Sequence, residues 1–194
     1  MTAAPPFELL DPADATAVAG YERSFYAAFA PVTSNRLIRW LWQWDDAGGR
    51  LATSIPYADQ QIYLQRSAAG GIAAALAVNV ALRQVQGAAF GFGLPQTTGT
   101  CEFLTVFVNA DHDLKTRHVF WSACFADLRR RGLHTAYATT ARRPLLLYRR
   151  LGGDVVDTAV IENEERFFLR FSLARDYIRA RTGRVAQAEA DAAD

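Results

Sequence analysis

The chain has 194 residues, of which 51% are hydrophobic and 12% aromatic, so it can fold around a sizeable core and is not a disordered chain. Its formal net charge of +1 argues against dedicated nucleic-acid binding, which usually needs a clear basic excess. Two cysteines, Cys101 and Cys124, are too few for a disulfide framework, and we expect both to be small packing residues in a reducing compartment.

The segment at the amino end lacks the basic start and apolar core of a secretory signal. The longest apolar run, residues 71–82, is too short to span a bilayer. We therefore expect a cytoplasmic protein without membrane contact. With neither internal repeats nor a linker, the expected organisation is a single domain over residues 1–183, followed by a disordered alanine-rich tail over residues 184–194.

The first half of the chain predicts two helices followed by strands. Asp11 can cap a helix over residues 13–29. A second helix can run from Ser34 to Trp44, although the aromatic residues at every second position near its end also allow a strand. The elements expected next are a turn, a half-buried strand, a hairpin turn and a fully buried strand, at residues 45–49, 60–66, 69–71 and 72–81.

The second half predicts the order strand, loop, helix, strand, helix, strand, strand. The corresponding ranges are residues 101–109, 110–117, 118–131, 133–139, 143–151, 154–161 and 166–173. Together with the first half, this order predicts an α/β sandwich, in which helices flank a mixed central sheet.

One short motif adds a family resemblance. Residues 147–152 read Leu-Tyr-Arg-Arg-Leu-Gly, which resembles the "LYxxLGF" ending of the acyl-CoA-binding half of the GNAT superfamily of N-acyltransferases. Gly153 stands where that family usually has an aromatic residue. The order of elements is also that of the GNAT family. The resemblance implies a GNAT-like fold, an acyl thioester donor, acetyl-CoA or another acyl-CoA, and an amine acceptor held as a small molecule or peptide.

The donor motif of the family departs from its usual form here. The pattern R/Q-x-x-G-x-G/A, whose backbone N–H groups hold the pyrophosphate of coenzyme A, falls on residues 113–118 and lacks both glycines. The donor can still bind partly through side chains that suit phosphate. The implied donor-binding residues are Phe107, Val108, Lys115, Thr116, Arg117, His118 and Val119.

The missing glycines leave two alternatives open. The donor can instead be an acyl chain on an acyl carrier protein, as in the related N-acyl amino acid synthases and acyl-homoserine-lactone synthases. The arginines at residues 129–131, 142, 143, 149 and 150 would then face the acidic carrier. Alternatively, the chain is a non-catalytic GNAT-fold protein that binds a ligand or partner. We favour an acyl-CoA donor.

The resemblance also implies two catalytic residues. Tyr148 lies where many family members place the acid that protonates the departing thiolate at the splay of the sheet. Glu102 lies where some members keep a general base, although it can equally be an exposed carboxylate at a strand end. We predict no metal site, since the histidines and cysteines lack the spacing of zinc ligands.

Two further expectations concern surfaces. The aromatic residues of the first two helices lie in the segment that usually covers the acceptor site in this family, and they can line an acceptor or acyl pocket or simply form core. The strand pair over residues 154–173 can serve a homodimer, a state that the family often adopts.

Overall fold

The computed structural model describes residues 6–32, 36–109 and 114–173, apart from the side chains of residues 114–118. The described residues form a seven-stranded sheet with the order β1-β4-β5-β6-β7-β9-β8. β6 and β7 run parallel, and the other neighbouring strands of this sheet are antiparallel. The predicted mixed sheet is therefore confirmed. Its strands are β1 (Glu8–Leu9), β4 (Gln60–Arg66), β5 (Ile72–Asn79), β6 (Thr100–Val108), β7 (Thr135–Ala141), β8 (Gly153–Ile161) and β9 (Glu164–Ser172).

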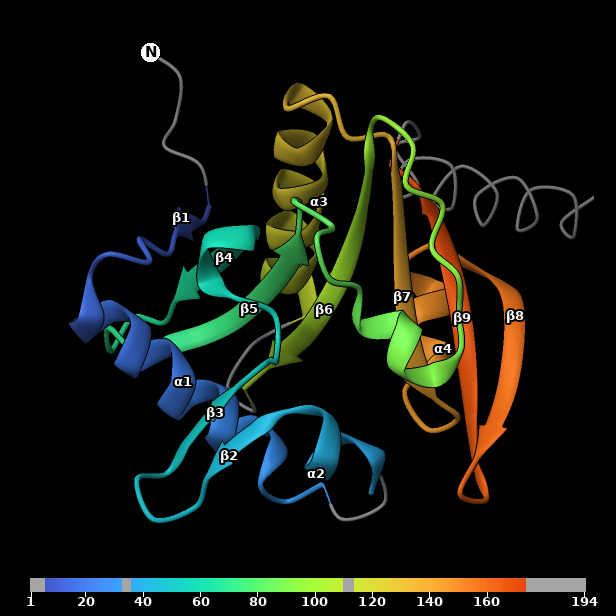
Figure 1. The fold of residues 1–194 in the computed structure, drawn as a ribbon. Coiled ribbons are helices and arrows are strands. Elements are labelled where there is room, and N and C mark those ends of the chain that lie inside the picture. Colours follow the sequence, from blue (N-terminus) through green and yellow to red (C-terminus); the bar gives the residue numbers. More distant parts are fainter. Residues whose placement is uncertain (1–5, 33–35, 110–113, 174–194) are drawn as a thin grey trace, which may run out of the picture.

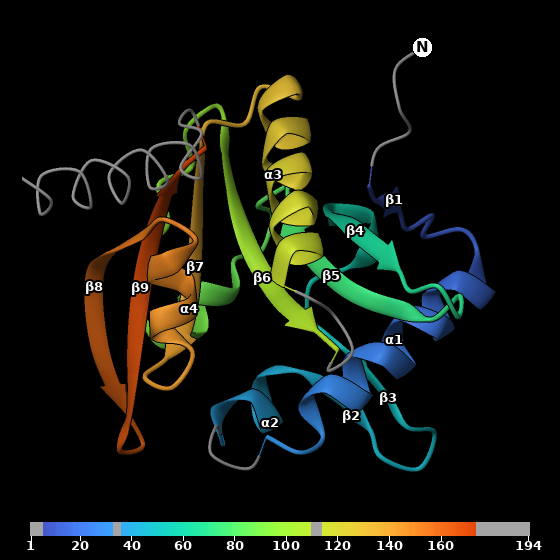
Figure 2. The ribbon, with the colours of Figure 1, turned by 180° about the vertical axis from the view of Figure 1, so that it is seen from behind.

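The helices form two outer layers, one on each face of this sheet (Figures 1 and 2). They are α1 (Ala15–Phe29), α2 (Leu37–Leu41), α3 (Leu114–Arg130) and α4 (Leu145–Arg150), with short 3₁₀ turns η1 (Tyr57–Asp59) and η2 (Gln86–Phe90). One core lies under α1 and α2, where Phe25 and Leu37 are fully buried. The other lies under α3 and is extended by α4, with Phe120 and Leu128 fully buried. The predicted sandwich is thus present.

The start of the chain differs from the prediction in the residue that caps the first helix and in the length of the second helix. Asp14, not Asp11, caps α1, because its carboxylate accepts hydrogen bonds from the backbone N–H groups of Thr16 and Ala17. The second predicted helix is a five-residue α2, which gives way to a small separate hairpin of β2 (Gln43–Asp45) and β3 (Arg50–Ala52). Both interpretations of that segment were therefore partly right: helix at its start and strand at its end.

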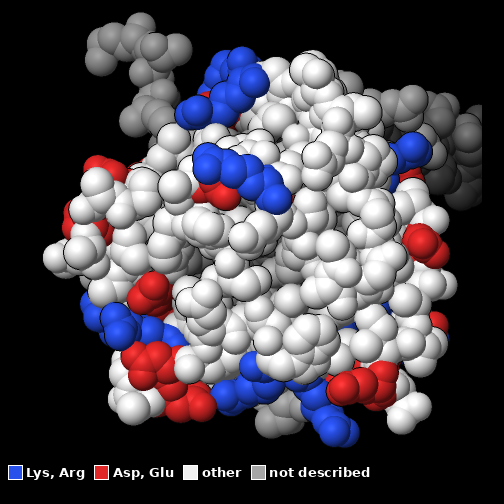
Figure 3. Space-filling model, viewed as in Figure 1, with Lys and Arg blue, Asp and Glu red and all other residues white. Residues whose placement is uncertain are grey.

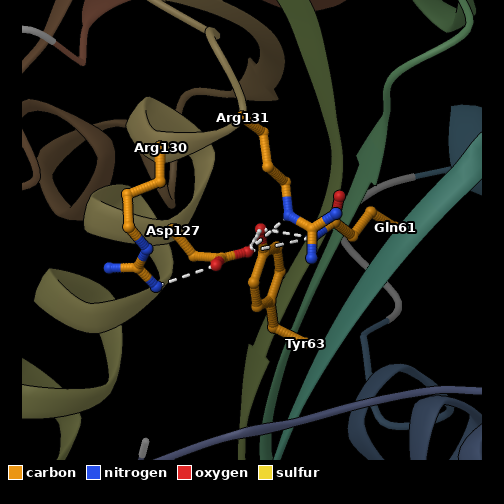
Figure 4. A network of polar contacts seen from close by, with 5 residues as sticks. All are labelled: Gln61, Tyr63, Asp127, Arg130 and Arg131. Atoms are coloured by element: carbon orange, nitrogen blue, oxygen red, sulfur yellow. Dashed lines mark hydrogen bonds and ion pairs between the residues drawn. The ribbon is translucent and has the colours of Figure 1, made fainter.

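The carboxyl end of α3 is held against β4 by the carboxylate of Asp127 (Figure 4). This carboxylate accepts hydrogen bonds from the Tyr63 hydroxyl at 2.9 Å, Gln61 Nε2 at 3.1 Å, Arg131 Nε at 2.7 Å and Arg130 Nη2 at 2.8 Å. Burial alone would raise the pKa of Asp127, but these hydrogen bonds outweigh it and lower that pKa. Asp127 therefore joins a helix to a strand across the edge of the core.

The sheet is split in its middle. β6 pairs with β7 only from Thr100 to Phe103, whereas its pairing with β5 continues to Val108. Phe103 and Thr105 of β6 oppose Val78 and Ala77 of β5, so Leu104 is an extra, bulged residue. A bulge bends its strand and increases the local twist. Since the bulge follows directly after the last β6–β7 pair, we infer that it turns β6 away from β7, and the two strands diverge (Figures 1 and 2).

Gly153, the departure from the family motif, has a packing reason. A Cβ atom built there would lie 2.7 and 2.9 Å from ring atoms of Phe171. Phe171 is itself buried in β9, the strand next to β8. The aromatic ring in this part of the core is thus supplied by β9, and residue 153 has no room for a side chain.

Several sequence expectations fall outside the described residues. The proposed domain end at residue 183 and the tail over residues 184–194 both do.

Among the described residues, no helix combines the length and apolar character needed to cross a bilayer. No grouping of three or more histidine, cysteine, aspartate or glutamate side chains suited to a metal ion occurs in the described part of the chain.

Candidate active site

A cleft lies where β6 and β7 separate. It has a volume of about 60 Å³ and opens on the side of the sheet that carries α1 and α2. Its walls are polar and apolar in similar measure, and the polar groups come from η2, the diverging strands, α4 and β9. The lining residues include Phe29, Trp42, Gln86, Phe90, Thr139, Tyr148 and Arg166.

A wider hollow of about 860 Å³ adjoins this cleft and shares Phe29, Ala141 and Pro144 with it. Its rim carries charges of both signs, including Glu164 and an ion pair of Arg142 with Glu165. The cleft and the hollow together provide a route from solvent to the split in the sheet. Over the rest of this face most charged side chains lie toward the periphery, and the centre is uncharged (Figure 3).

Tyr148 borders the cleft, as an acid at the splay of the sheet would have to. It lies on α4, and its side chain contributes both to the cleft and to the packed region beneath α3 and α4. Its ring lies 6.3 Å from that of Phe171, and no described residue makes a hydrogen bond with its hydroxyl. Burial raises the pKa of Tyr148 to about 12, so the phenol keeps its proton at neutral pH.

Glu102 lies deeper than the sequence suggested. It is 1% exposed, so the exposed strand-end position considered for it is wrong. Its Oε1 accepts a hydrogen bond from Gly87 N at 2.7 Å, and its Oε2 accepts from Gln86 N at 3.0 Å and Asn79 Nδ2 at 3.1 Å. Burial raises the pKa of Glu102, and the three hydrogen bonds act in the opposite direction. The carboxylate anchors η2 to β5 and β6.

Gln86 connects this anchor to the cleft. Its side-chain oxygen accepts a hydrogen bond from the indole N–H of Trp42 at 2.8 Å, and its Nε2 donates to the carbonyl of the bulged Leu104 at 3.3 Å. Each of these three residues lines the cleft. Glu102 therefore reaches the cleft wall only through Gln86, and its carboxylate is not among the lining groups.

The residues implied for donor binding gather around the open end of β6. Phe107 is buried with its ring stacked on Phe25 at 5.8 Å, so its backbone, not its side chain, faces the split. Val108 is half-buried and is the last residue of β6, and Val119 is 48% exposed on α3. The helix begins at Leu114, earlier than predicted, so that residues 115–117 belong to its first turn and not to a loop. The side chains of Lys115, Thr116, Arg117 and His118 lie outside the described residues.

Two lining residues escaped the sequence analysis. Arg166 begins the predicted strand at residues 166–173, which also contains Arg170, so its charge did not distinguish it, and the sequence gave no hint that this strand lies beside β7. Gln86 comes directly before a glycine-rich stretch and belongs to no motif of its own. Both positions depend on which strands become neighbours.

Comparisons with known proteins agree with this architecture. No protein-family model matches the sequence, and no curated protein is similar to it in sequence. Structurally, the chain is similar to BjaI, a CoA-dependent acyl-homoserine lactone synthase solved with SAM and isopentyl-CoA. The identity is 15%, the TM-score is 0.66, and the match covers 94% of this chain and 90% of BjaI.

Two further structures support the same fold. MesI, another CoA-dependent acyl-homoserine lactone synthase, matches with 12% identity, a TM-score of 0.65, and coverage of 89% of this chain and 91% of its own. A protein from Desulfovibrio desulfuricans described as a GNAT-family acetyltransferase matches with 14% identity, a TM-score of 0.55 and coverage of 86% and 98%. The chain has the GNAT fold, and the predicted resemblance is confirmed at that level.

Proposed function

Starting from a GNAT fold whose split sheet carries a cleft with Tyr148 on its wall, we propose that the chain is an N-acyltransferase. It moves an acyl group from acyl-CoA to an amine held on the α1–α2 side of the cleft. The neighbours with bound or required CoA favour a CoA thioester over an acyl carrier protein as the donor. The single observation that carries the proposal is that the cleft lies at the split in the sheet and that Tyr148 lines it.

The donor is proposed to bind across the open end of β6 and the start of α3. The first backbone N–H groups of a helix have no partner within the helix, and the helix dipole favours an anion there. α3 has 17 residues and begins at Leu114, a short distance along the chain from the end of β6 at Val108, so we expect its first turn beside the open end of β6. Its N–H groups suit the pyrophosphate, while the unpaired edge of β6 suits the amide groups of the pantetheine arm.

The proposed reaction is a direct attack. The amine nitrogen bonds to the thioester carbonyl carbon, the carbon–sulfur bond breaks, the amine loses a proton, and the sulfur leaves as the thiol of coenzyme A. A phenol with a pKa of about 12 is a weaker acid than an ordinary thiol, so complete proton transfer from Tyr148 to the thiolate is uphill. Tyr148 is therefore proposed to act first as a hydrogen-bond donor to the sulfur as its charge develops.

The base role of Glu102 stays a prediction. Because Gln86 and Gly87 lie between this carboxylate and the cleft, proton transfer to it needs an intervening group. Its anchoring of η2 offers a second way for Glu102 to affect activity. The variant Glu102→Gln separates the base role from the anchoring role.

Binding and turnover are tested separately. Titration calorimetry with acetyl-CoA and longer acyl-CoAs measures donor binding, and thiol release with a panel of amines, amino acids and SAM measures transfer. Tyr148→Phe is expected to lower kcat roughly 10²-fold while leaving acyl-CoA affinity in place, because it removes one donor near the developing charge. Tyr137→Phe, on β7 and not among the cleft-lining residues, is the matched control. Binding of acyl-CoA without turnover of any amine, and with no effect of Tyr148→Phe, would favour the non-catalytic alternative.

A further inference from the structure

The cleft is bounded by side chains from both faces of the sheet. Tyr148 packs against the core beneath α3, whereas Trp42 belongs to the core beneath α1 and α2, and both residues line the cleft. The cleft therefore passes through the split in the sheet, with Trp42 on the wall opposite Tyr148. The proposed function places the sulfur of the donor beside Tyr148. The acyl carbons bonded to that sulfur then extend through the split toward Trp42.

Trp42 is held firmly in this wall. It is 8% exposed, and its indole N–H donates a hydrogen bond to Gln86 Oε1 at 2.8 Å. The centre of its ring lies 5.0 Å from the ring centres of both Phe25 and Phe29. Gln86 is fixed in turn, because its backbone N–H donates to the buried carboxylate of Glu102. Trp42 therefore cannot turn away and enlarge the cleft without losing its hydrogen bond and both ring contacts.

The free space in front of Trp42 suits only a short acyl group. The cleft has a volume of about 60 Å³. An apolar cavity of about 150 Å³ holds one benzene molecule, so the cleft has room for roughly two or three carbon atoms. This is the length of an acetyl or a propionyl group. Further methylene groups would have to be forced against packed side chains, which is unfavourable.

The outer hollow does not remove this limit. It adjoins the cleft at Phe29 and Pro144, and together the two provide the route from solvent to the split. The amine has to reach the thioester carbonyl along this route. A long acyl chain that lay in the hollow would occupy the same space and keep the amine out. The hollow therefore suits the acceptor, and the cleft suits the acyl group.

We propose that Trp42 determines the length of the transferred acyl group and restricts the donor to acetyl-CoA and propionyl-CoA. This inference rests on the proposed acyl transfer. It makes Trp42 a specificity-determining residue, whose ring meets the end of the acyl chain opposite Tyr148. A smaller side chain at position 42 extends the cleft and admits a longer chain.

The test compares acetyl-CoA with hexanoyl-CoA as donors. The ratio of their kcat/KM values is measured by thiol release for the wild-type protein and for Trp42→Leu, with the amine that the wild type acylates fastest. We expect the wild type to prefer acetyl-CoA on the order of 100-fold, and this preference to fall about tenfold or more in Trp42→Leu. Trp44→Leu is the matched control. It removes a tryptophan that packs against Tyr26 outside the cleft lining, and it is expected to keep the wild-type preference.

A second measurement needs only the wild-type protein and holds even if Trp42→Leu does not fold. Titration calorimetry compares acetyl-, propionyl-, butyryl- and hexanoyl-CoA in the absence of an amine. A chain buried in an open pocket would bind about fourfold more tightly for each added methylene group. We expect no such gain beyond propionyl-CoA, because the longer chains find no further space in the cleft.

Three results would contradict the role of Trp42 and leave acyl transfer standing. The first is an affinity that keeps rising about fourfold per methylene group up to hexanoyl-CoA. The second is turnover of hexanoyl-CoA by the wild type as fast as that of acetyl-CoA. The third is an unchanged preference for acetyl-CoA in folded Trp42→Leu, since another wall would then set the limit. Failure to transfer any acyl group to any amine would remove the proposed function itself.

Discussion

Glu102→Gln replaces a buried carboxylate, whose two oxygens both accept hydrogen bonds, by an amide of the same size. The amide has one accepting oxygen and one donating NH₂ group. The site holds three N–H groups, from Gly87, Gln86 and Asn79, which all point at the carboxylate. Whichever way the new amide is turned, its NH₂ group faces at least one of these donors. The other hydrogen bonds then go to a neutral acceptor in place of a charged one.

The magnitude follows from these contacts. One buried donor left without an acceptor costs roughly 1–3 kcal/mol, and each hydrogen bond that loses its charged partner weakens by about 1 kcal/mol. Burial raises the pKa of Glu102, which means that the buried negative charge is itself unfavourable. Removing that charge therefore offsets part of the lost stability. We therefore expect the free energy of unfolding to fall by about 2–3 kcal/mol, a large part of the 5–15 kcal/mol that such domains usually have.

Urea unfolding followed by tryptophan fluorescence measures this loss, and Trp42 reports on the same network because its indole is bound to Gln86. Glu8→Gln is the matched control. Its carboxylate forms an exposed ion pair with Arg66, and we expect a change within about 0.5 kcal/mol. Equal unfolding midpoints for Glu102→Gln and the wild type would refute the anchoring argument.

The same variant separates the two roles of Glu102. If Glu102 only anchors η2, the activity of Glu102→Gln should fall in proportion to the fraction of unfolded protein. It should recover when folding is restored by lower temperature or by bound acyl-CoA. A general base predicts a loss of kcat that persists in fully folded protein, together with loss of the acidic limb of the pH–rate profile.

Three further predictions concern other parts of the molecule. Asp127→Asn should lower the unfolding free energy by about 2 kcal/mol at neutral pH. Since the folded pKa of Asp127 is lowered, its contribution is present above the ordinary carboxyl pKa and is lost as the pH falls through the folded pKa; the variant should lack this acid dependence in urea midpoints measured from pH 3 to 7. Gly153→Ala should destabilise by about 1–3 kcal/mol in thermal unfolding because its Cβ meets the Phe171 ring, whereas Gly93→Ala, with nothing within 4 Å, should change little. Because the pKa of Tyr148 is about 12, the kcat/KM profiles of wild type and Tyr148→Phe should keep one shape up to about pH 10; an alkaline limb present only in the wild type would contradict this.

Much of the fold could be predicted from the sequence because its signals are local. The buried strand at residues 72–81 and the hairpin turn before it came from an apolar run next to paired glycines, and the structure has β5 at Ile72–Asn79. Element ends were less certain. Residues 114–117 belong to a mainly polar segment without an apolar stripe, which predicts a loop, but they form the first turn of α3.

The site was only half accessible to sequence reasoning. Tyr148 was found through a local motif, and it does border the cleft. Arg166 was missed because its place depends on β9 lying between β7 and β8, a strand order that no local pattern states. The burial of Glu102 was missed for a similar reason, since the cover over it comes from η2, 15 residues away along the chain.

The bulge at Leu104 has a consequence for how the donor loop is allowed to vary. β6 carries one inserted residue relative to β5 directly after Phe103, where its pairing with β7 ends. The split between β6 and β7 is thus a property of the sheet itself. It does not depend on glycines in the segment that follows β6. Such a chain can lose the glycines of the usual pyrophosphate-binding motif and still keep an accessible cleft in the middle of its sheet.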